Sequence, residues 1–457
     1  MKGNPVRDHS LYQLSDALKD FLAIPLLILL AFVGLSFVLH ALDKSTPAWL
    51  LPLKRSIGQY IFKSSDATGT FLEVVAGGLF TQASIIISML LLTLQQTATS
   101  MGNMIYDQFL HRYRNQFYTG YIVGSLMMVI LLKTTIDQDF NPVLSAGVAL
   151  LVTFFALVLL VWFLYSIIEQ MRPEMVIDTI RERTIRARRQ QRKFLARTRA
   201  SSRIDHPVQA VLTLERTGFL TQIDWKKLEK CLVGCGAEVE VIFRANVGDY
   251  IASRTPVLEV KALEPHEARQ LAGRLGAALT VEKVRTVRQD ADYGLKQLEM
   301  IAWTDSSTAR HNPEVGLLAV NALRDLLSRW AREMPEGKKE DGLLPVVYAE
   351  DSAAEVLNVY ESLFVVAAES QQHQIAAALA SSLAAGYPHL SPTLQSHADR
   401  VVCCAIATLR KQTFTHELAV ALADLVAALQ DAERAGTAAA LRSAREELAA
   451  SLGHLKH

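Results

Sequence analysis

The longest uncharged stretch of this chain runs from Val74 to Tyr106 and joins an apolar first part to a polar second part. Val74 to Leu94 is long enough to cross a bilayer alone, because about 20 apolar residues in a helix span roughly 30 Å of hydrocarbon. The residues from Gln95 to Ser100 are mainly amides and hydroxyls. We therefore predict a membrane-spanning helix that continues as a more polar helix beyond the bilayer.

Small and polar residues recur along this helix at alternating steps of three and four, which places them on one face. With Leu91 at one of the steps, these positions are Gly77, Thr81, Ser84, Ser88, Leu91, Gln95, Ala98 and Gly102. We call them the stripe. One interpretation is a packing face, because small residues let membrane helices approach closely. The other is the wall of a water-filled pathway, formed when several subunits turn this face toward a common axis. Of the residues of the stripe, Gln95 is the one that a packing face explains least.

Three further apolar stretches predict additional spans. The first begins at Phe21 and ends at Ala41-Leu42-Asp43, a poor signal-peptidase site, so we interpret it as an anchor and not as a cleaved signal. If both termini are inside, the inside flanks of the spans carry more Lys and Arg than the outside loops, which favours this orientation. Residues 43–73 then form the one sizeable external loop. We predict a transmembrane domain over residues 1–170, with spans at about 21–42, 74–96, 115–132 and 141–168.

A basic segment follows the fourth predicted span. Between Arg183 and Arg203 there are nine basic residues and no acidic residue. Three interpretations are open: a stop signal near anionic headgroups, a nucleic-acid-binding arm, or a ring of positive charge at the inner mouth of an oligomeric pore. Interleaved aromatic residues are almost absent, so we expect no nucleic-acid partner. We predict a basic juxtamembrane helix over 171–205, and the candidates for inner-mouth charge are Arg112, Arg114, Arg186 and Arg189.

The remaining sequence predicts a cytosolic α+β region, so the fold class is a membrane α-helical protein with a small β module followed by a helical bundle. Segments rich in β-formers alternate with turns over residues 206–290, and Asp224 is placed to cap a short helix that runs through Cys231. A short strand is expected at 344–348. Residues 291–457 are mainly helical, with Ala- and Leu-rich segments separated by Gly and Pro, as in a helical bundle.

The sequence offers no motif for catalysis. It has no phosphate-binding loop with Lys before Ser or Thr, no dinucleotide-binding glycine pattern and no nucleophile elbow. The β module is similar in pattern to biotinyl and lipoyl domains but lacks their modified lysine hairpin, and the four cysteines match no zinc spacing. We therefore expect no enzyme activity, no cofactor and no metal site.

One polar segment could bind a ligand. Asp290 precedes a predicted helix, and a turn rich in Ser and Thr follows that helix and ends at Pro313. Asp290, Asp305, His311 and Asn312 could gather around a cation or an anion. Alternatively, these side chains cap the two adjacent helices.

The most distinctive motif of the chain is Arg285-Thr286-x-x-Gln289-Asp290-x-x-Tyr293-Gly294-Leu295-Lys296-Gln297-Leu298, accompanied by Gly218-Phe-Leu-x-x-Ile-Asp224 and the Gly248-Asp249 turn. Together these motifs resemble a bacterial family of predicted membrane proteins, named domain of unknown function 2254. The family's Pro-Gly turn is absent here, where residues 307–313 take its place. The resemblance implies a multi-pass protein of the bacterial inner membrane and supplies no activity.

Two functional hypotheses follow. The first is a homo-oligomeric inner-membrane ion channel or transporter with both termini cytosolic and a cytosolic assembly or gating domain. Its partners would be the lipid bilayer, further copies of the chain and inorganic ions. Its pathway would be lined by Thr81, Ser84, Ser88, Gln95 and Thr99, because hydroxyls and amides can replace part of an ion's hydration shell. The alternative is a non-conducting membrane scaffold or sensor whose cytosolic domain binds a partner or a small ligand.

Overall fold

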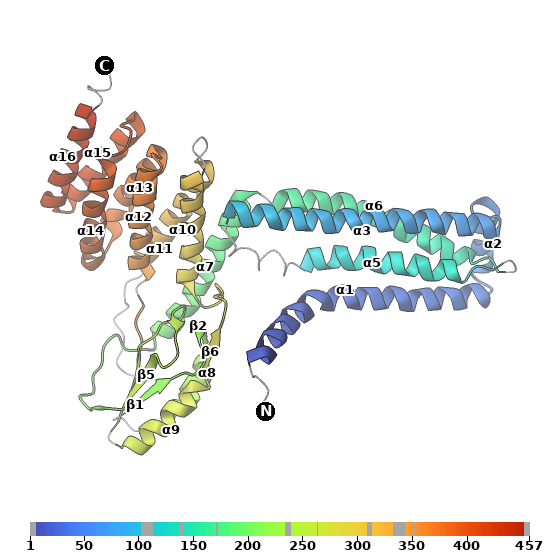
Figure 1. Ribbon diagram of the computed structural model, residues 1–457, viewed down its shortest axis with the longest axis horizontal. Helices are drawn as coiled ribbons and strands as arrows, with labels where there is room; N and C mark the ends of the chain where they lie inside the picture. Colours follow the sequence, from blue (N-terminus) through green and yellow to red (C-terminus); the bar gives the residue numbers. More distant parts are fainter. Residues whose placement is uncertain are drawn as a thin grey trace. The chain divides into compact units, whose positions relative to one another are not determined.

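The computed structural model describes residues 6–101, 113–137, 140–170, 172–233, 239–262, 264–308, 313–331, 343–350 and 352–451. The chain divides into two compact units, residues 1–172 and residues 173–457 (Figure 1). Each unit has its own apolar core, and each is described by itself below.

The first unit is built from long helices, and four of its described helices are long and apolar enough to span a membrane. These candidate spans are Leu22–Lys44, Ser65–Thr93, Arg114–Thr134 and Val143–Glu169, so their number is the predicted four. The complete helices are α1 (Val6–Lys44), α2 (Leu51–Tyr60), α3 (Ser65–Met101), α5 (Tyr113–Thr134) and α6 (Val143–Gln170).

Most of the predicted external segment, residues 43–73, is helical. It contains the whole of α2 and the first turns of α3. Glu73, the charged residue just before the predicted second span, lies within α3. It forms an ion pair of 2.7 Å with Lys133 near the end of α5. The polar-to-apolar boundary at Glu73 therefore marks no end of a helix.

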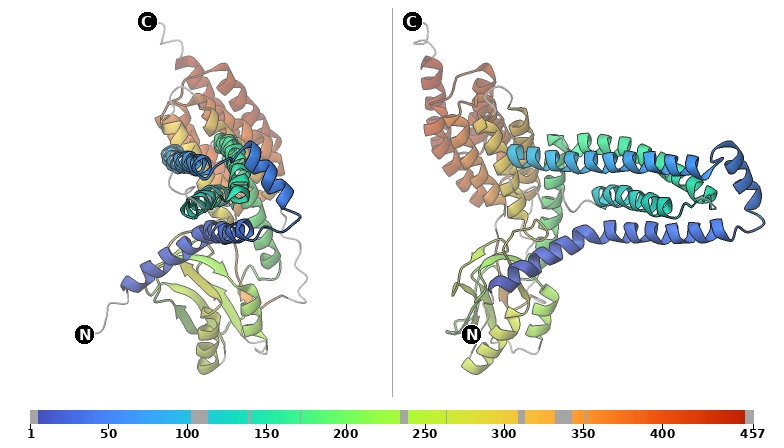
Figure 2. Two further views of the ribbon diagram at one scale, coloured as in Figure 1. Left: turned by 90° about the vertical axis from the view of Figure 1, so that its right-hand side faces the viewer. Right: turned by 45° about the vertical axis from the view of Figure 1, so that its right-hand side comes forward.

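Helix α5 contacts the other three long helices of the first unit, α1, α3 and α6. Seen from the end of the unit in the left view of Figure 2, the four long helices lie around one another as a bundle. Glycines allow α1 to approach α5 closely: a Cβ atom at Gly120 would lie 2.8 Å from the Pro25 Cα, and one at Gly124 would lie 2.6 Å from a ring carbon of Phe32. This spacing is the small-x-x-x-small pattern of close membrane-helix packing.

A buried carboxylate joins the end of α1 to the start of α6. Asp43 accepts hydrogen bonds from the backbone N–H of Leu144 (3.0 Å) and Ser145 (2.8 Å) and from the Ser145 hydroxyl (2.5 Å). Its side chain is fully buried and lies 3.5 Å from the Lys54 ammonium of α2. The carboxylate thus satisfies N–H groups that the first turn of a helix leaves unpaired, and it also complements the helix dipole.

The second unit begins with α7 (Pro173–Leu195), followed by an α+β region. Its strands form a four-stranded sheet of order β1-β5-β3-β7 and a three-stranded sheet of order β4-β2-β6. The predicted cap is confirmed, since Asp224 accepts from the Lys227 N–H at the start of α8. The elements are β1 (Val208–Thr213), β2 (Gly218–Ile223), α8 (Trp225–Leu232), β3 (Glu240–Phe243), β4 (Tyr250–Ile251), β5 (Pro256–Lys261), α9 (Pro265–Gly276) and β6 (Leu279–Glu282).

The predicted strand at 344–348 is confirmed as β7 (Val346–Val347), which pairs in parallel with β3. The chain therefore returns from the helical region to complete the sheet. Backbone hydrogen bonds also tie this strand segment to residues just after α7, from the Arg199 N–H to the Val346 carbonyl (2.8 Å) and from the Leu344 N–H to the Arg197 carbonyl (2.9 Å).

The sequence predicts a helical bundle after β6, and in the structure these helices stack in two layers. Helices α10, α12, α14 and α16 contact one another in sequence, and so do α11, α13 and α15 (Figure 1). Neighbours two elements apart thus pack as in stacked helical pairs, and buried alanines such as Ala376, Ala380 and Ala421 allow close approach. The bounds are α10 (Ala291–Thr308), α11 (Glu314–Trp330), α12 (Ser352–Glu369), α13 (His373–Gly386), the 3-10 helix η2 (Tyr387–His389), α14 (Pro392–Leu409), α15 (His416–Asp431) and α16 (Ala435–Ser451).

Candidate functional site

The stripe on α3 faces away from the core of the first unit. Thr81, Ser84, Ser88 and Gln95 are exposed, whereas Leu72, Leu79 and Ile86 are almost completely buried against the other helices. At about 100° per residue, the buried positions and the stripe lie on opposite sides of the helix. Thr81, Ser84 and Ser88 therefore take no part in packing between the described helices of the protomer.

Two hydroxyl groups of the stripe bond within their own helix. Thr81 donates to the Gly77 carbonyl (2.9 Å) and Ser84 donates to the Phe80 carbonyl (3.1 Å). Each hydroxyl proton is thus used, while the oxygen lone pairs remain available as acceptors. The side chain of Thr99 lies outside the described residues.

One polar residue of α3 that packs inside the first unit is not a member of the stripe. Gln82 is buried, and its Nε2 atom donates to the Ala156 carbonyl of α6 at 2.6 Å. Such a bond between membrane helices satisfies an amide that would otherwise be unpaired in a dry core. Gln82 and the stripe therefore lie on different faces of α3.

The four arginines considered for the inner mouth are placed in different parts of the chain. Arg112 lies outside the described residues, and Arg114 is exposed at the start of α5. Arg186 and Arg189 lie on α7 of the second unit, where Arg186 is exposed and pairs with Glu182 at 2.7 Å. Arg189 is exposed and lines a pocket described below.

Helix α7 is a packed element of the second unit and is not a free basic arm. Ile177, Ile180, Ala187 and Phe194 are buried on one of its faces, and the helix contacts α10 and α11. Basic side chains of the segment also pair with acids: Arg197 pairs with Glu229, and Arg199 pairs with the fully buried side chain of Glu240. Much of the basic run is thereby used to hold the second unit together.

Asp290 is held by neighbouring protein groups. Its carboxylate accepts from the Arg285 guanidinium at 2.8–2.9 Å and from the Tyr293 N–H at 2.8 Å, at the start of α10. The Arg285 guanidinium also lies over the rings of Phe219 and Tyr293. Burial raises the pKa of Asp290 to about 6, although Arg285 acts in the opposite direction. The turn at Gly248, with φ +101°, lies so close that a Cβ atom there would be 2.6 Å from the Asp290 Oδ2.

Other residues of the same motif make structural contacts. The Gln289 side chain accepts from the Ile223 N–H of β2 at 3.3 Å, and Gly294 packs so tightly on α7 that a Cβ atom would lie 1.9 Å from the Thr184 hydroxyl oxygen. The motif thus joins the β module to α10 and α7. Asp305 lies at the other end of α10 and accepts from the Gly316 N–H of α11 at 2.7 Å, while His311 and Asn312 lie outside the described residues.

A buried acidic cluster that the sequence did not indicate lies near Asp290. Asp292 and Glu350 are both strongly desolvated, and burial raises the pKa of Asp292 and raises that of Glu350 to about 7. Tyr348 donates a hydrogen bond to Glu350, and the nearby charge of Arg188 acts on both acids. Among the described residues, no group of His, Cys, Asp and Glu has the arrangement of a metal site.

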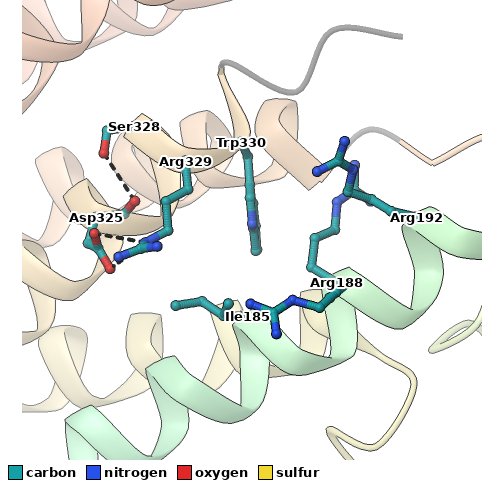
Figure 3. Close-up of a pocket in the computed structure, with 8 residues that line it drawn as sticks. Ile185, Arg188, Arg192, Asp325, Ser328, Arg329 and Trp330 are labelled. Atoms are coloured by element: carbon teal, nitrogen blue, oxygen red, sulfur yellow. Dashed lines mark hydrogen bonds and ion pairs between the residues drawn. The ribbon is translucent and has the colours of Figure 1, made fainter. Parts of the chain in front are cut away.

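A pocket opens between α7 and the C-terminal half of α11, with a volume of about 500 Å³. Figure 3 shows the Trp330 ring between Arg329 on one side and Arg188 and Arg192 on the other. The Arg188 guanidinium lies 5.8 Å from the centroid of the Trp330 ring. The residues that line the pocket are Ile185, Arg188, Arg189, Arg192, Asp325, Ser328, Arg329 and Trp330.

The fold and these contacts define a membrane protein with four apolar helices and a separate α+β unit. Residues 19–384 match the family model described as predicted membrane protein, domain of unknown function 2254. The chain belongs to this family. Comparisons with curated proteins and with solved structures gave no match.

Proposed function

We propose that this protein is a homo-oligomeric ion channel or transporter of the bacterial inner membrane, in which α3 lines the pathway. The observation that carries the proposal is the position of the stripe. Thr81, Ser84 and Ser88 are exposed on the side of α3 opposite its packed face, so the protomer leaves them for another copy or for water.

The comparison with α6 argues against lipid as the only neighbour of the stripe. The exposed face of α6 carries large apolar side chains, among them Leu151, Phe154, Val158 and Trp162, which suit contact with lipid tails. The stripe instead places glycine and hydroxyl residues between two flanks of larger apolar side chains, with Phe80 on one flank and Ile85 on the other. Small and hydroxyl residues of this kind occur where membrane helices meet or where water enters.

The acceptor oxygens of the stripe suit the coordination of ions, although the stripe itself carries no charged side chain. The Thr81 and Ser84 hydroxyls donate their protons to carbonyls of their own helix, so their oxygens are oriented to accept. Oxygens of this kind can replace part of the hydration shell of a cation. In this proposal both termini lie in the cytosol, and the second unit acts as the assembly or gating domain.

A second candidate function, a non-conducting sensor, is favoured by the arginine-lined pocket of the second unit. In that case the stripe would be a dry contact between copies. Planar-bilayer recording of the purified protein separates the two. We expect a conductance that Ser88→Leu and Gln95→Leu reduce, with Ile85→Leu as the control on an exposed position beside the stripe. The absence of any current through an intact oligomer, at all voltages and salt gradients applied, would contradict the channel proposal.

A further inference from the structure

We propose that the pocket between α7 and α11 binds a small molecule that carries phosphate groups. This site is distinct from the stripe on α3, and its occupation does not depend on ion conduction. The argument rests on the charge, the size and the rigidity of the pocket.

The charge of the pocket lining is strongly positive. Four arginines line it, namely Arg188, Arg189, Arg192 and Arg329, and Asp325 is the one acid among its lining residues. Asp325 is already engaged, since it pairs with Arg329 at 3.0 Å and with Arg181 at 2.8 Å. Guanidinium groups bind phosphate oxygens through paired N–H donors, which makes phosphate a favoured anion for such a lining.

The size of the pocket exceeds what a single inorganic ion needs. Its volume of about 500 Å³ lies within the range of sites for small organic ligands, roughly 300–1,000 Å³. The lining also has an apolar part, made by Ile185 and the Trp330 ring (Figure 3). A ligand with an organic moiety beside its phosphate groups would use both parts of the lining.

The inner wall of the pocket is rigid before any ligand arrives. Trp330 is only 3% exposed and Arg188 only 8%. The Arg188 Nη1 atom donates to the Ser352 hydroxyl at 3.0 Å, and its guanidinium lies near the Trp330 ring. Two of the arginines, Arg189 and Arg192, are exposed on the outer turns of α7. The fixed inner arginine lowers the entropy cost of binding, and the exposed outer arginines supply further N–H donors.

The same phosphate chemistry could come from a soluble molecule or from a lipid headgroup, because α7 follows the fourth span directly in the sequence. Two experimental arms distinguish these sources. In the first, the full-length protein in neutral detergent is titrated by calorimetry with pyrophosphate and with adenosine triphosphate. In the second, the protein in nanodiscs of phosphatidylcholine is compared with nanodiscs that contain phosphatidylglycerol, and the thermal midpoint of unfolding is measured.

The test variant is Arg189→Gln/Arg192→Gln, and the matched control is Arg186→Gln/Lys193→Gln, which removes the same charge from α7 outside the pocket. Each lost hydrogen bond to a charged group corresponds to about a tenfold change in affinity. In the first arm we expect the test variant to weaken phosphate binding by about tenfold or more, while the control stays within about twofold of the wild type. In the second arm we expect the test variant to lose the stabilisation by phosphatidylglycerol, while the control keeps it. Binding in the first arm identifies a soluble ligand, and stabilisation confined to phosphatidylglycerol identifies a headgroup.

Two results would overturn the proposal. One is the absence of binding to pyrophosphate and adenosine triphosphate together with equal stability in both kinds of nanodisc. The other is an equal loss in the test and control variants, which would indicate attraction to the general charge of α7. Circular dichroism of each variant verifies that it is folded, and both outer arginines are exposed, so the substitutions leave the core intact.

Discussion

Glu350 is the buried acid whose ionisation we expect to limit the stability of the second unit at neutral pH. Its environment favours the uncharged form: burial is the largest influence, and the neighbouring charges of Asp292 and Asp290 act in the same direction. The hydrogen bond from Tyr348 and the charge of Arg188 oppose them only partly. Glu350→Gln keeps the shape and an acceptor oxygen while it removes the ionisable group.

The magnitude follows from the pKa of Glu350, which is about 7 in the folded protein against an ordinary value of 4.5. This difference corresponds to roughly 3 kcal/mol. Between pH 4.5 and 7 the folded unit retains a proton that the unfolded chain has lost, so the wild type loses stability as the pH rises through this window. Glu350→Gln should therefore be more stable than the wild type above pH 7, by up to roughly 3 kcal/mol, and equally stable near pH 4.5.

Thermal unfolding followed by tryptophan fluorescence measures this effect, because Trp225 and Trp330 lie in the second unit. For a unit of this size we expect a rise in the midpoint on the order of 6 °C at pH 8 that vanishes toward pH 4.5. Glu369→Gln, at an exposed position in the last turn of α12, should leave the midpoint nearly unchanged throughout. A Glu350→Gln variant less stable than the wild type at pH 8 would refute the reasoning, since it would mean that Arg188 stabilises an ionised Glu350.

Two further predictions concern the first unit. Gly124→Leu should separate α1 from α5, because even a Cβ atom would lie 2.6 Å from the Phe32 ring; we expect a loss of at least about 2 kcal/mol in denaturant titration. Gly34→Leu on α1, where a Cβ atom meets nothing within 4 Å, is the tolerant control. Asp43→Ala should cost about 2 kcal/mol by removing the buried cap of α6. The exposed Asp66→Ala on α3 should cost less than half as much, and equal losses in the two aspartate variants would contradict the capping role.

Hydropathy predicted the four spans because a bilayer sets a length and a composition that each helix must meet alone. The cap at Asp224 was predictable for a similar reason, since it depends on residues three positions apart. The close contact of Gly120 and Gly124 with α1 was not predicted, because the spacing of the two glycines in the sequence does not say which helix approaches them.

The role of α7 was the least predictable part. Its charge indicated a membrane-adjacent arm, while the spacing of Ile177, Ile180 and Phe194 carried a weaker signal for the packed face that the structure has. The pocket brings together α7 and α11, which are far apart in the sequence, and the Asp43 cap joins residues about 100 positions apart. No local pattern encodes such pairs, because their proximity results from the packing of whole helices.

The central claim is that water and ions reach the stripe on α3, and thiol labelling tests it most directly. In a chain with its four native cysteines replaced, Ser84→Cys lies on the stripe and Ile85→Cys lies at the adjacent exposed position on the apolar flank. The oligomer in a bilayer is treated with a charged, membrane-impermeant thiol reagent. We expect rapid modification of Ser84→Cys and little modification of Ile85→Cys. Equal protection of both cysteines would contradict a water-filled pathway and leave the stripe as a dry contact between copies.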